Sequence, residues 1–230
     1  MPTPDRKAWK GMGMEGIVAR WYTRTRRNDM KDFRQEARGV AKDLRTASSV
    51  LEVAPGPGFF AIELAKLGDF KITGLDISKT FVKIANKNAR EAGVDIDFRL
   101  GNASAMPFAD ECFDFVYCSA AFKNFSQPVQ ALDEMHRVLR PRGQAMIVDL
   151  STDASIAEID SYVKQSGRGR IDAWMTKWTF KHVLLKRAYS RADFVRMAQQ
   201  SRFGGCEFQR GPFGLCVQFT KPAKSTLHAS

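Results

Sequence analysis

A run of residues at 49–58 combines a strand, a turn and an acid in a way that suits ligand binding. Residues 50–53 are apolar and favour a buried β-strand, and Glu52 lies within this strand. Small and rigid residues follow, including Gly56 and Gly58, and a helical pattern begins directly after them. This order of elements places a helix N-terminus where a ligand can approach the backbone closely.

The glycine turn also fits a dinucleotide-binding pattern. Residues 56–61 read G-x-G-x-x-A, and Asp76 follows Gly56 by 20 residues, where an acid that binds a ribose belongs. A nicotinamide cofactor is therefore one interpretation. Three features argue against it. A buried carboxylate such as Glu52 is costly without a partner, the chain lacks room for a second mononucleotide half, and it ends in a hairpin.

The elements around this turn alternate between strands and helices. The predicted strands are 50–53, 70–76, 96–100, 113–118, 144–150, 206–210 and 215–220. The predicted helices are two within 14–44 that break near 28–29, then 58–67, 79–92, about 132–139, 153–165, 171–186 and 190–200. Short connections and this alternation predict an α/β fold with a doubly wound, mostly parallel seven-stranded sheet. The glycine-containing link at 211–214 predicts a C-terminal antiparallel hairpin.

We predict a single domain over residues 1–230. It comprises N-terminal helices (1–48), a ligand-binding core (49–150), a lid-like helical insertion (151–187), and a last helix with the hairpin (188–230). No apolar run is long enough for a membrane span, and no apolar segment follows the first seven residues, so we expect no signal peptide and a cytoplasmic protein.

The net charge of +11 is concentrated in the flanks of the chain. Residues 1–48 carry +6 and residues 151–230 carry +7, whereas 49–150 carry −2. This excess suits either an RNA-binding surface or a solvated basic surface, and we favour the second because few aromatic residues are interleaved. The four cysteines and three histidines have no metal-ligand spacing, so we predict no metal site.

Five segments in order resemble the motifs of class I S-adenosylmethionine-dependent methyltransferases. Residues 52–58 resemble the E/D-x-G-x-G-x-G turn, 74–78 the acid motif of the second strand, and 101–108 the G-D-A-x-x-L-P-F loop. Residues 113–116 match F-D-x-V, and 135–143 resemble the segment that contains R-V-L-K-P-G-G. The match covers about residues 45–150 and resembles most the branch that includes the ubiquinone and menaquinone methylases. It implies a Rossmann-like methyltransferase fold and an S-adenosylmethionine cofactor, released as S-adenosylhomocysteine.

The chain departs from this pattern at three positions. Ala54 stands at the first glycine of the turn, where we expect only a slight shift of the backbone. Asn102 replaces an aspartate, and its carbonyl oxygen can still accept a hydrogen bond from an adenine amino group. Arg142 replaces a glycine after Pro141, which we expect to matter only for structure.

The resemblance implies a role for each cofactor-site residue. The turn residues would let the methionine portion lie close to the chain, Glu52 would accept hydrogen bonds near its amino end, and Asp76 would accept both ribose hydroxyls. Asp76 could instead cap the next helix, and Ile77 could be core rather than an adenine contact. The cofactor-binding set is Tyr22, Glu52, Ala54, Pro55, Gly56, Gly58, Asp76, Ile77, Asn102, Ala103, Cys118 and Ser119.

The acceptor side of the site is predicted from the loop after residue 118, the N-terminal helices and the insertion. Lys123 or Asn124 would orient the acceptor as the catalytic candidates; either could equally be a surface residue. The substrate-binding candidates are Trp21, Phe122, Trp174 and Trp178. Packing in the core is the rival interpretation, favoured slightly more for Trp21 than for Tyr22.

The function predicted is methyl transfer to a small, partly apolar or aromatic molecule by in-line displacement at a sulfonium. One alternative is an RNA methyltransferase that uses the basic flanks, although no N/D-P-P-Y/F motif follows the fourth strand. Another is a protein of the same fold that binds the cofactor without methyl transfer. The sequence identifies neither the acceptor atom nor an oligomeric state.

Overall fold

The computed structural model describes residues 9–10, 13–153, 188–211 and 214–223. The strands are β1 (Ser49–Val53), β2 (Lys71–Asp76), β3 (Asp97–Leu100), β4 (Phe113–Ser119), β5 (Leu139–Asp149), β6 (Glu207–Gly211) and β7 (Gly214–Thr220). The helices are α1 (Gly16–Arg26), α2 (Met30–Ala41), α3 (Phe59–Ala65), α4 (Lys79–Ala92), α5 (Pro128–Val138) and α8 (Arg191–Gln200), with 3-10 turns η1 (Arg27–Asp29) and η2 (Phe122–Asn124). Most of the predicted lid, with Trp174 and Trp178, lies outside the described residues.

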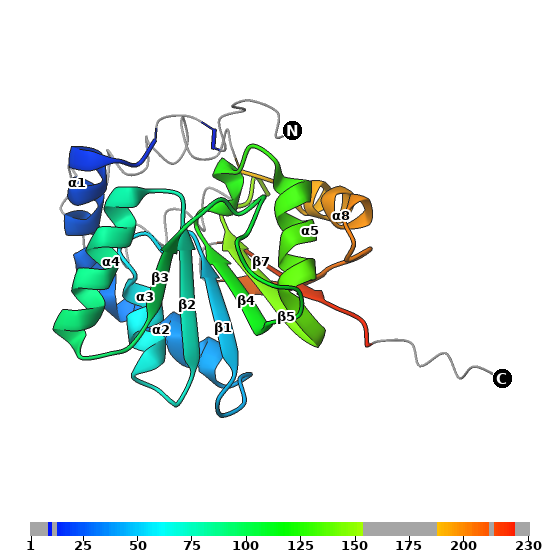
Figure 1. Ribbon diagram of the computed structural model, residues 1–230. Helices are drawn as coiled ribbons and strands as arrows, with labels where there is room; N and C mark the ends of the chain where they lie inside the picture. Colours follow the sequence, from blue (N-terminus) through cyan, green and yellow to red (C-terminus); the bar gives the residue numbers. More distant parts are fainter. Residues whose placement is uncertain (1–8, 11–12, 154–187, 212–213, 224–230) are drawn as a thin grey trace.

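The strands form one seven-stranded sheet in the order β3-β2-β1-β4-β5-β7-β6 (Figure 1). All neighbours are parallel except β5 with β7 and β7 with β6. The predicted doubly wound sheet and its C-terminal antiparallel hairpin are therefore confirmed. The strand order reverses between β1 and β4, and ligands bind at such a reversal, outside the carboxyl ends of the strands.

Helices cover both faces of the sheet and create two cores. On one face, α2, α3 and α4 pack against side chains such as Phe115 and Tyr117 of β4. On the other, α5 and α8 pack against side chains such as Val116 and Cys118. Because successive side chains of a strand point to opposite faces, β4 contributes to both cores. This alternation decides which side chains near the carboxyl end of β4 can reach a ligand.

The sequence explains where α4 begins and ends. The Ser78 hydroxyl accepts a hydrogen bond of 3.1 Å from the Phe81 amide, so Ser78 is the N-cap as predicted. Gly93 ends the helix in the left-handed conformation, which glycine adopts without a Cβ penalty. The carboxylate of Glu15 covers the same N-terminus from outside, accepting 2.9 and 3.1 Å hydrogen bonds from the amides of Lys79 and Thr80.

The predicted start of the fifth strand is wrong. We expected the strand at 144–150, after a helix that stops at Pro141, but α5 ends at Val138 and β5 begins at Leu139. The pairing with β4 shifts its register between Phe113 and Phe115, which accommodates the extra residues. Arg142 lies in this irregular stretch with φ of 67°. The strand can therefore include the proline because its ladder is interrupted there.

The predicted break between two N-terminal helices is confirmed. The 3-10 turn at 27–29 separates α1 from α2, and α1 stands at the outside of the molecule beside α4 (Figure 1). Tyr22 of α1 packs edge-on against Phe81 of α4, with ring centroids 5.8 Å apart. Among the described residues, no helix is long and apolar enough to span a membrane.

Candidate active site

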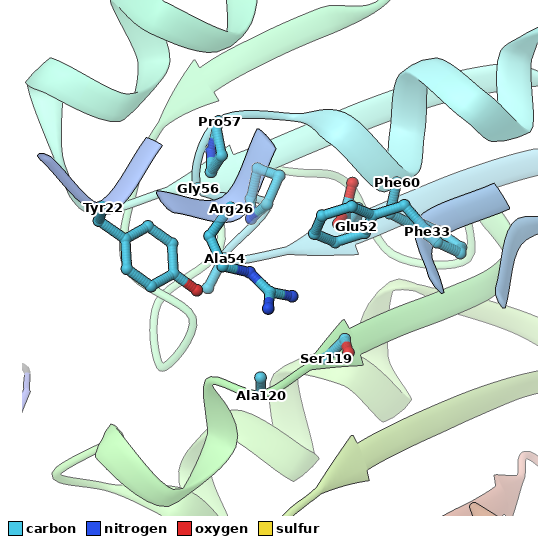
Figure 2. A pocket seen from close by; sticks show the side chains of 11 residues that line it. Tyr22, Arg26, Phe33, Glu52, Ala54, Gly56, Pro57, Phe60, Ser119 and Ala120 are labelled. Atoms are coloured by element: carbon cyan, nitrogen blue, oxygen red, sulfur yellow. The ribbon is translucent and has the colours of Figure 1, made fainter. Parts of the chain in front are cut away.

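A cavity lies where β1 and β4 end, roofed by α1 (Figure 2). Its walls outline about 390 Å³ of space, part of which is open to solvent. Its lining residues are Tyr22, Arg26, Phe33, Glu52, Ala54, Pro55, Gly56, Pro57, Phe60, Ser119 and Ala120. Its position at the reversal of the strand order is where this fold class places ligands.

The turn after β1 is built from left-handed residues. Ala54, Gly56 and Gly58 have φ of 57°, 54° and 78°. A Cβ on Gly56 would meet only the Tyr22 ring, 3.9 Å away, so the space beside Gly56 is open. A Cβ on Gly58 would lie 2.7 Å from Phe98 Cζ. Gly58 is thus required by internal packing, whereas Gly56 faces the cavity.

Glu52 lines this cavity and has one carboxyl oxygen without a hydrogen-bond partner. The residue is 4% exposed, and its Oε2 atom has no hydrogen-bond partner within the described residues. Burial, reinforced by the nearby Glu36 carboxyl, raises the pKa of Glu52 to about 8. A buried, unpaired carboxyl beside open space is suited to a cationic group of a ligand.

A second carboxyl, the half-buried Glu36 of α2, contacts a residue that lines the cavity. It accepts a 3.0 Å hydrogen bond from the Ser119 hydroxyl and another from the Tyr117 hydroxyl. Burial raises the pKa of Glu36, and these two hydrogen bonds oppose that shift. Ser119 itself lines the cavity, so it connects the cavity to this carboxyl.

Asp76 fixes the glycine turn in place. Its Oδ2 accepts a 2.9 Å hydrogen bond from the Gly56 amide, and its Oδ1 accepts a 2.8 Å hydrogen bond from the Ser78 amide. Burial raises the pKa of Asp76 to about 6, and the two amides oppose the shift. Each carboxylate oxygen keeps a further lone pair for a ligand hydroxyl.

Arg26 places a cation on the α1 side of the cavity. Its guanidinium lies 2.6 Å from the Asp29 carboxylate and stacks over the Phe33 ring at 4.8 Å. Figure 2 shows Arg26 and Tyr22 reaching from α1 toward the space above Ala54. The cavity therefore has a cation on α1 and the acid Glu52 on β1.

The adenine-side candidates lie along the same edge of the sheet. Ile77 is 39% exposed, so it is not core, and an adenine contact remains a prediction. The Asn102 side-chain oxygen accepts a 2.9 Å hydrogen bond from the Ser104 amide, which shapes the loop after β3. Ala103 is partly buried against the core on the α5 face. The predicted adenine role of the last two stays untested.

The structure places the three predicted catalytic and acceptor residues of the loop after β4 away from the described cavity. Lys123 is 4% exposed, and its ammonium lies 2.7 Å from the Asp149 carboxylate, so it is neither a surface residue nor free to orient an acceptor. Phe122 is fully buried and stacks on Phe194 at 5.5 Å. Asn124 ends η2, where its carbonyl accepts a 2.7 Å hydrogen bond from the Lys10 amide. None of the three loop residues lines the described cavity.

Two further predicted site residues point elsewhere. Cys118 is fully buried on the α5 face of β4, so its side chain faces the core, whereas its neighbour Ser119 lines the cavity. Trp21 is 64% exposed on α1 and is neither core nor cavity wall. Tyr22, one residue on, does line the cavity. Substrate contact by Trp21 stays a prediction.

Several residues at the site were missed by sequence reasoning. They are Arg26, Phe33, Glu36, Pro57, Phe60 and Ala120. The signal for Arg26 was its spacing of four residues from Tyr22, which puts both on one helix face. Glu36 and Phe33 similarly share a face of α2, but no feature of the sequence distinguishes them from other residues of that helix.

Comparisons with known sequences find methyltransferases. A family model described as a methyltransferase domain matches residues 51–147. The demethylmenaquinone methyltransferase of Chlorobaculum parvum is 39% identical over 165 residues, which cover 69% of this chain and 67% of that protein. The ubiquinone/menaquinone biosynthesis C-methyltransferase UbiE of Bdellovibrio bacteriovorus is 36% identical over 106 residues, but they span only 46% of this chain and 45% of that protein.

A solved structure supports the fold. The chain is similar to a Methanococcus maripaludis protein described as an S-adenosyl-L-methionine-dependent methyltransferase, with a TM-score of 0.74 and 19% identity. The match covers 95% of this chain and 98% of that one. The expectations of a methyltransferase and of S-adenosylmethionine as its methyl donor are thus confirmed at the level of the family. By its sequence relatives and its fold, the chain belongs to the class I S-adenosylmethionine-dependent methyltransferases, and within them it resembles the quinone methylases.

Proposed function

We propose that the protein binds the methionine end of S-adenosylmethionine between Arg26 and Glu52 and methylates a ring carbon of a quinol-type aromatic molecule. The acceptor class is suggested by the names of the relatives, which describe methyltransferases acting in menaquinone and ubiquinone synthesis. The basic flanks add no observation in favour of an RNA acceptor.

The observation that carries the proposal is the pairing of a buried carboxyl group with a guanidinium at the cavity. Glu52 offers an unpartnered carboxyl oxygen, and Arg26 offers a guanidinium from α1. An amino acid carries an ammonium and a carboxylate on one carbon, so a site with one acid and one base complements it. The open space beside Gly56 leaves room for that group to lie against the backbone.

The remaining cofactor contacts follow from this placement. Asp76 lies next to Gly56, so its spare lone pairs are positioned to accept the ribose hydroxyls. The exposed Ile77 side chain would then cover a face of the adenine, with Asn102 and Ala103 beside its edge. Ser119 and Ala120, on the opposite wall, would lie nearest the sulfur (Figure 2).

The chemistry needs little from the protein beyond alignment. Bound S-adenosylmethionine supplies an electrophilic methyl group on a sulfonium. A quinol ring carbon becomes nucleophilic when a neighbouring hydroxyl loses its proton, and the ring hydrogen leaves as a proton after the new C–C bond forms. Ser119, whose hydroxyl donates to Glu36, presents an oxygen that can accept a hydrogen bond from such a hydroxyl.

Calorimetry with two ligands tests the cofactor placement. S-adenosylhomocysteine has the amino-acid end, and 5′-methylthioadenosine lacks it. Arg26→Gln should weaken S-adenosylhomocysteine about tenfold or more and leave 5′-methylthioadenosine unchanged. Arg24→Gln, an exposed arginine on the same helix, is the matched control and should change neither affinity. Equal weakening of both ligands by Arg26→Gln would contradict the placement.

Product analysis tests the acceptor. The protein is incubated with demethylmenaquinol, kept reduced, and isotopically labelled S-adenosylmethionine, and the product is examined by mass spectrometry and NMR. The proposal requires one labelled methyl on a ring carbon. Label on oxygen, or none in a protein that binds the cofactor, would overturn the acceptor class.

A further inference from the structure

We propose that the outer face of α1 docks onto an anionic lipid membrane. This outer face consists of Ile17, Arg20, Trp21, Arg24 and Arg27, the last of which begins the 3-10 turn after the helix. All five residues are exposed. At 100° per residue they fall on one side of the helix, whereas Ala19 and Thr23 are buried on the other.

The apolar part of this face is unusual for a solvated helix. Ile17 is 81% exposed and Trp21 is 64% exposed, and they are the two most exposed large apolar side chains among the described residues. They are four residues apart, so they lie one turn from each other on the same side of α1. Tryptophan is suited to a membrane surface because its ring is apolar and its N–H can remain with polar headgroups.

The charged part of the face matches an anionic lipid surface. Arg20, Arg24 and Arg27 flank the apolar pair along one side, and none of them forms an ion pair within the described part of the chain. Residues 1–48 carry a net charge of +6, so the field around the helix is positive. An amphipathic helix with arginines beside apolar side chains binds in the plane of an anionic interface.

A lipid surface explains the face better than RNA does. RNA binding to unpaired bases uses stacked aromatic side chains, and this face has one aromatic ring. The exposed Ile17 side chain has no partner on a nucleic acid but gains from contact with acyl chains. The arginines alone would suit either anion, and the isoleucine–tryptophan pair decides for the membrane.

Docking on this face would also orient the active site. Tyr22 and Arg26, on the opposite side of α1, line the cavity at the carboxyl end of the sheet. The helix would therefore lie between the lipid surface and the cavity. This inference stands on α1 alone, so it can fail while the proposed methyl transfer holds.

Vesicle sedimentation with the full-length protein tests the proposal. The wild type should sediment with vesicles of phosphatidylcholine mixed with phosphatidylglycerol and remain in solution with phosphatidylcholine alone. Ile17→Ser with Trp21→Ser should lower the partition coefficient about tenfold or more. Arg20→Glu with Arg24→Glu should lower it at least about 25-fold, since each basic residue near such a surface contributes about fivefold.

A charge-matched control separates this face from general attraction. Lys42→Glu with Lys71→Glu removes the same charge at exposed positions on the amino-end side of the sheet and should preserve binding. Circular dichroism checks that each variant is folded, and release of the wild type by added salt gives a second measurement that needs no variant. The proposal is overturned if the wild type ignores the anionic vesicles, if the control loses binding equally, or if the arginine pair is needed only for binding tRNA.

Discussion

The Gly56 amide donates a 2.9 Å hydrogen bond to the Asp76 carboxylate, so the turn after β1 and the acid that ends β2 form one unit. The Ser78 amide donates to the other oxygen of the same carboxylate, at 2.8 Å. The Asp76 carboxylate, which we propose binds the ribose, is therefore oriented by backbone amides before any cofactor binds. Substituting Asp76 should affect both the shape of the turn and its affinity for the cofactor.

Asp76→Asn should weaken S-adenosylhomocysteine binding by about tenfold or more. An amide has one acceptor oxygen, so its NH₂ group would face either Gly56 or Ser78, both of which donate. Calorimetry measures the affinity, and thermal unfolding measures the accompanying loss of stability. Asp69→Asn, at an exposed position before β2, is the matched control and should change neither. Unchanged cofactor affinity in Asp76→Asn would refute the assigned role.

The stability of the ligand-free protein should fall as the pH rises, partly through Glu52. Its pKa is about 8 in the fold against 4.5 for the unperturbed group, so the folded state holds a proton that the unfolded state has released. The contribution of Glu52 is therefore complete below about pH 4.5 and is lost as the pH approaches 8. The shift corresponds to an upper estimate of about 5 kcal/mol.

Glu52→Gln removes this titration while keeping the shape of the side chain. Its free energy of unfolding, measured with urea from pH 5 to 8, should fall less steeply than that of the wild type. Glu36 and Asp76 also have raised pKa values, so part of the slope persists in the variant. Parallel curves for the two proteins would show that Glu52 does not hold a proton in the fold.

Ala54→Gly should stabilise the protein. Ala54 has φ of 57°, which costs about 1–2 kcal/mol for a residue with a Cβ, whereas glycine loses about 0.5–1 kcal/mol through its greater freedom when unfolded. The net gain should be roughly 0.5–1 kcal/mol in urea unfolding. Ala92→Gly, in the helical conformation at the end of α4, should destabilise instead. Destabilisation by both would mean that the Ala54 methyl contributes packing that outweighs its strain.

The sequence predicted the sheet and its caps because these depend on local signals. The apolar strands, the Ser78 cap and the Gly93 stop are each encoded within a few residues. The resemblance also located two positions where the family motif has glycine, and Ala54 and Arg142 adopt the left-handed backbone there. At both positions this chain adopts a backbone conformation that favours glycine without having glycine there.

The direction of side chains at the site was harder to predict. Ile17, Val18, Trp21 and Tyr22 form two adjacent apolar stripes on α1, and periodicity alone does not tell which one faces inward. After β4, Ala120 has a left-handed backbone, which ends the alternation of side chains along the strand. The face on which the following side chains lie can therefore not be predicted from the strand. Packing between distant elements decides both cases.

Lys123 was predicted to be a catalytic residue, but its ammonium is buried in an ion pair with Asp149. Its ammonium lies 2.7 Å from Asp149 and 2.5 Å from the Ala120 carbonyl, and the Asp149 carboxylate also accepts the Lys123 amide at 2.9 Å. Lys123→Met should destabilise the fold by about 3–5 kcal/mol, since it leaves the Asp149 carboxylate buried without its cation.

Adding Asp149→Asn to Lys123→Met should restore part of that stability. The asparagine is neutral, so the double variant buries no isolated charge. Its side-chain oxygen can still accept the hydrogen bond from the backbone amide of residue 123. Urea unfolding of the two single variants and the double variant gives the coupling energy of the pair. At a temperature where all are folded, S-adenosylhomocysteine affinity and methyl-transfer rate should stay within a few-fold of the wild type. A double variant that is stable and binds S-adenosylhomocysteine but transfers methyl groups far more slowly would contradict this expectation. Such a result would mean that the Lys123–Asp149 pair takes part in the reaction.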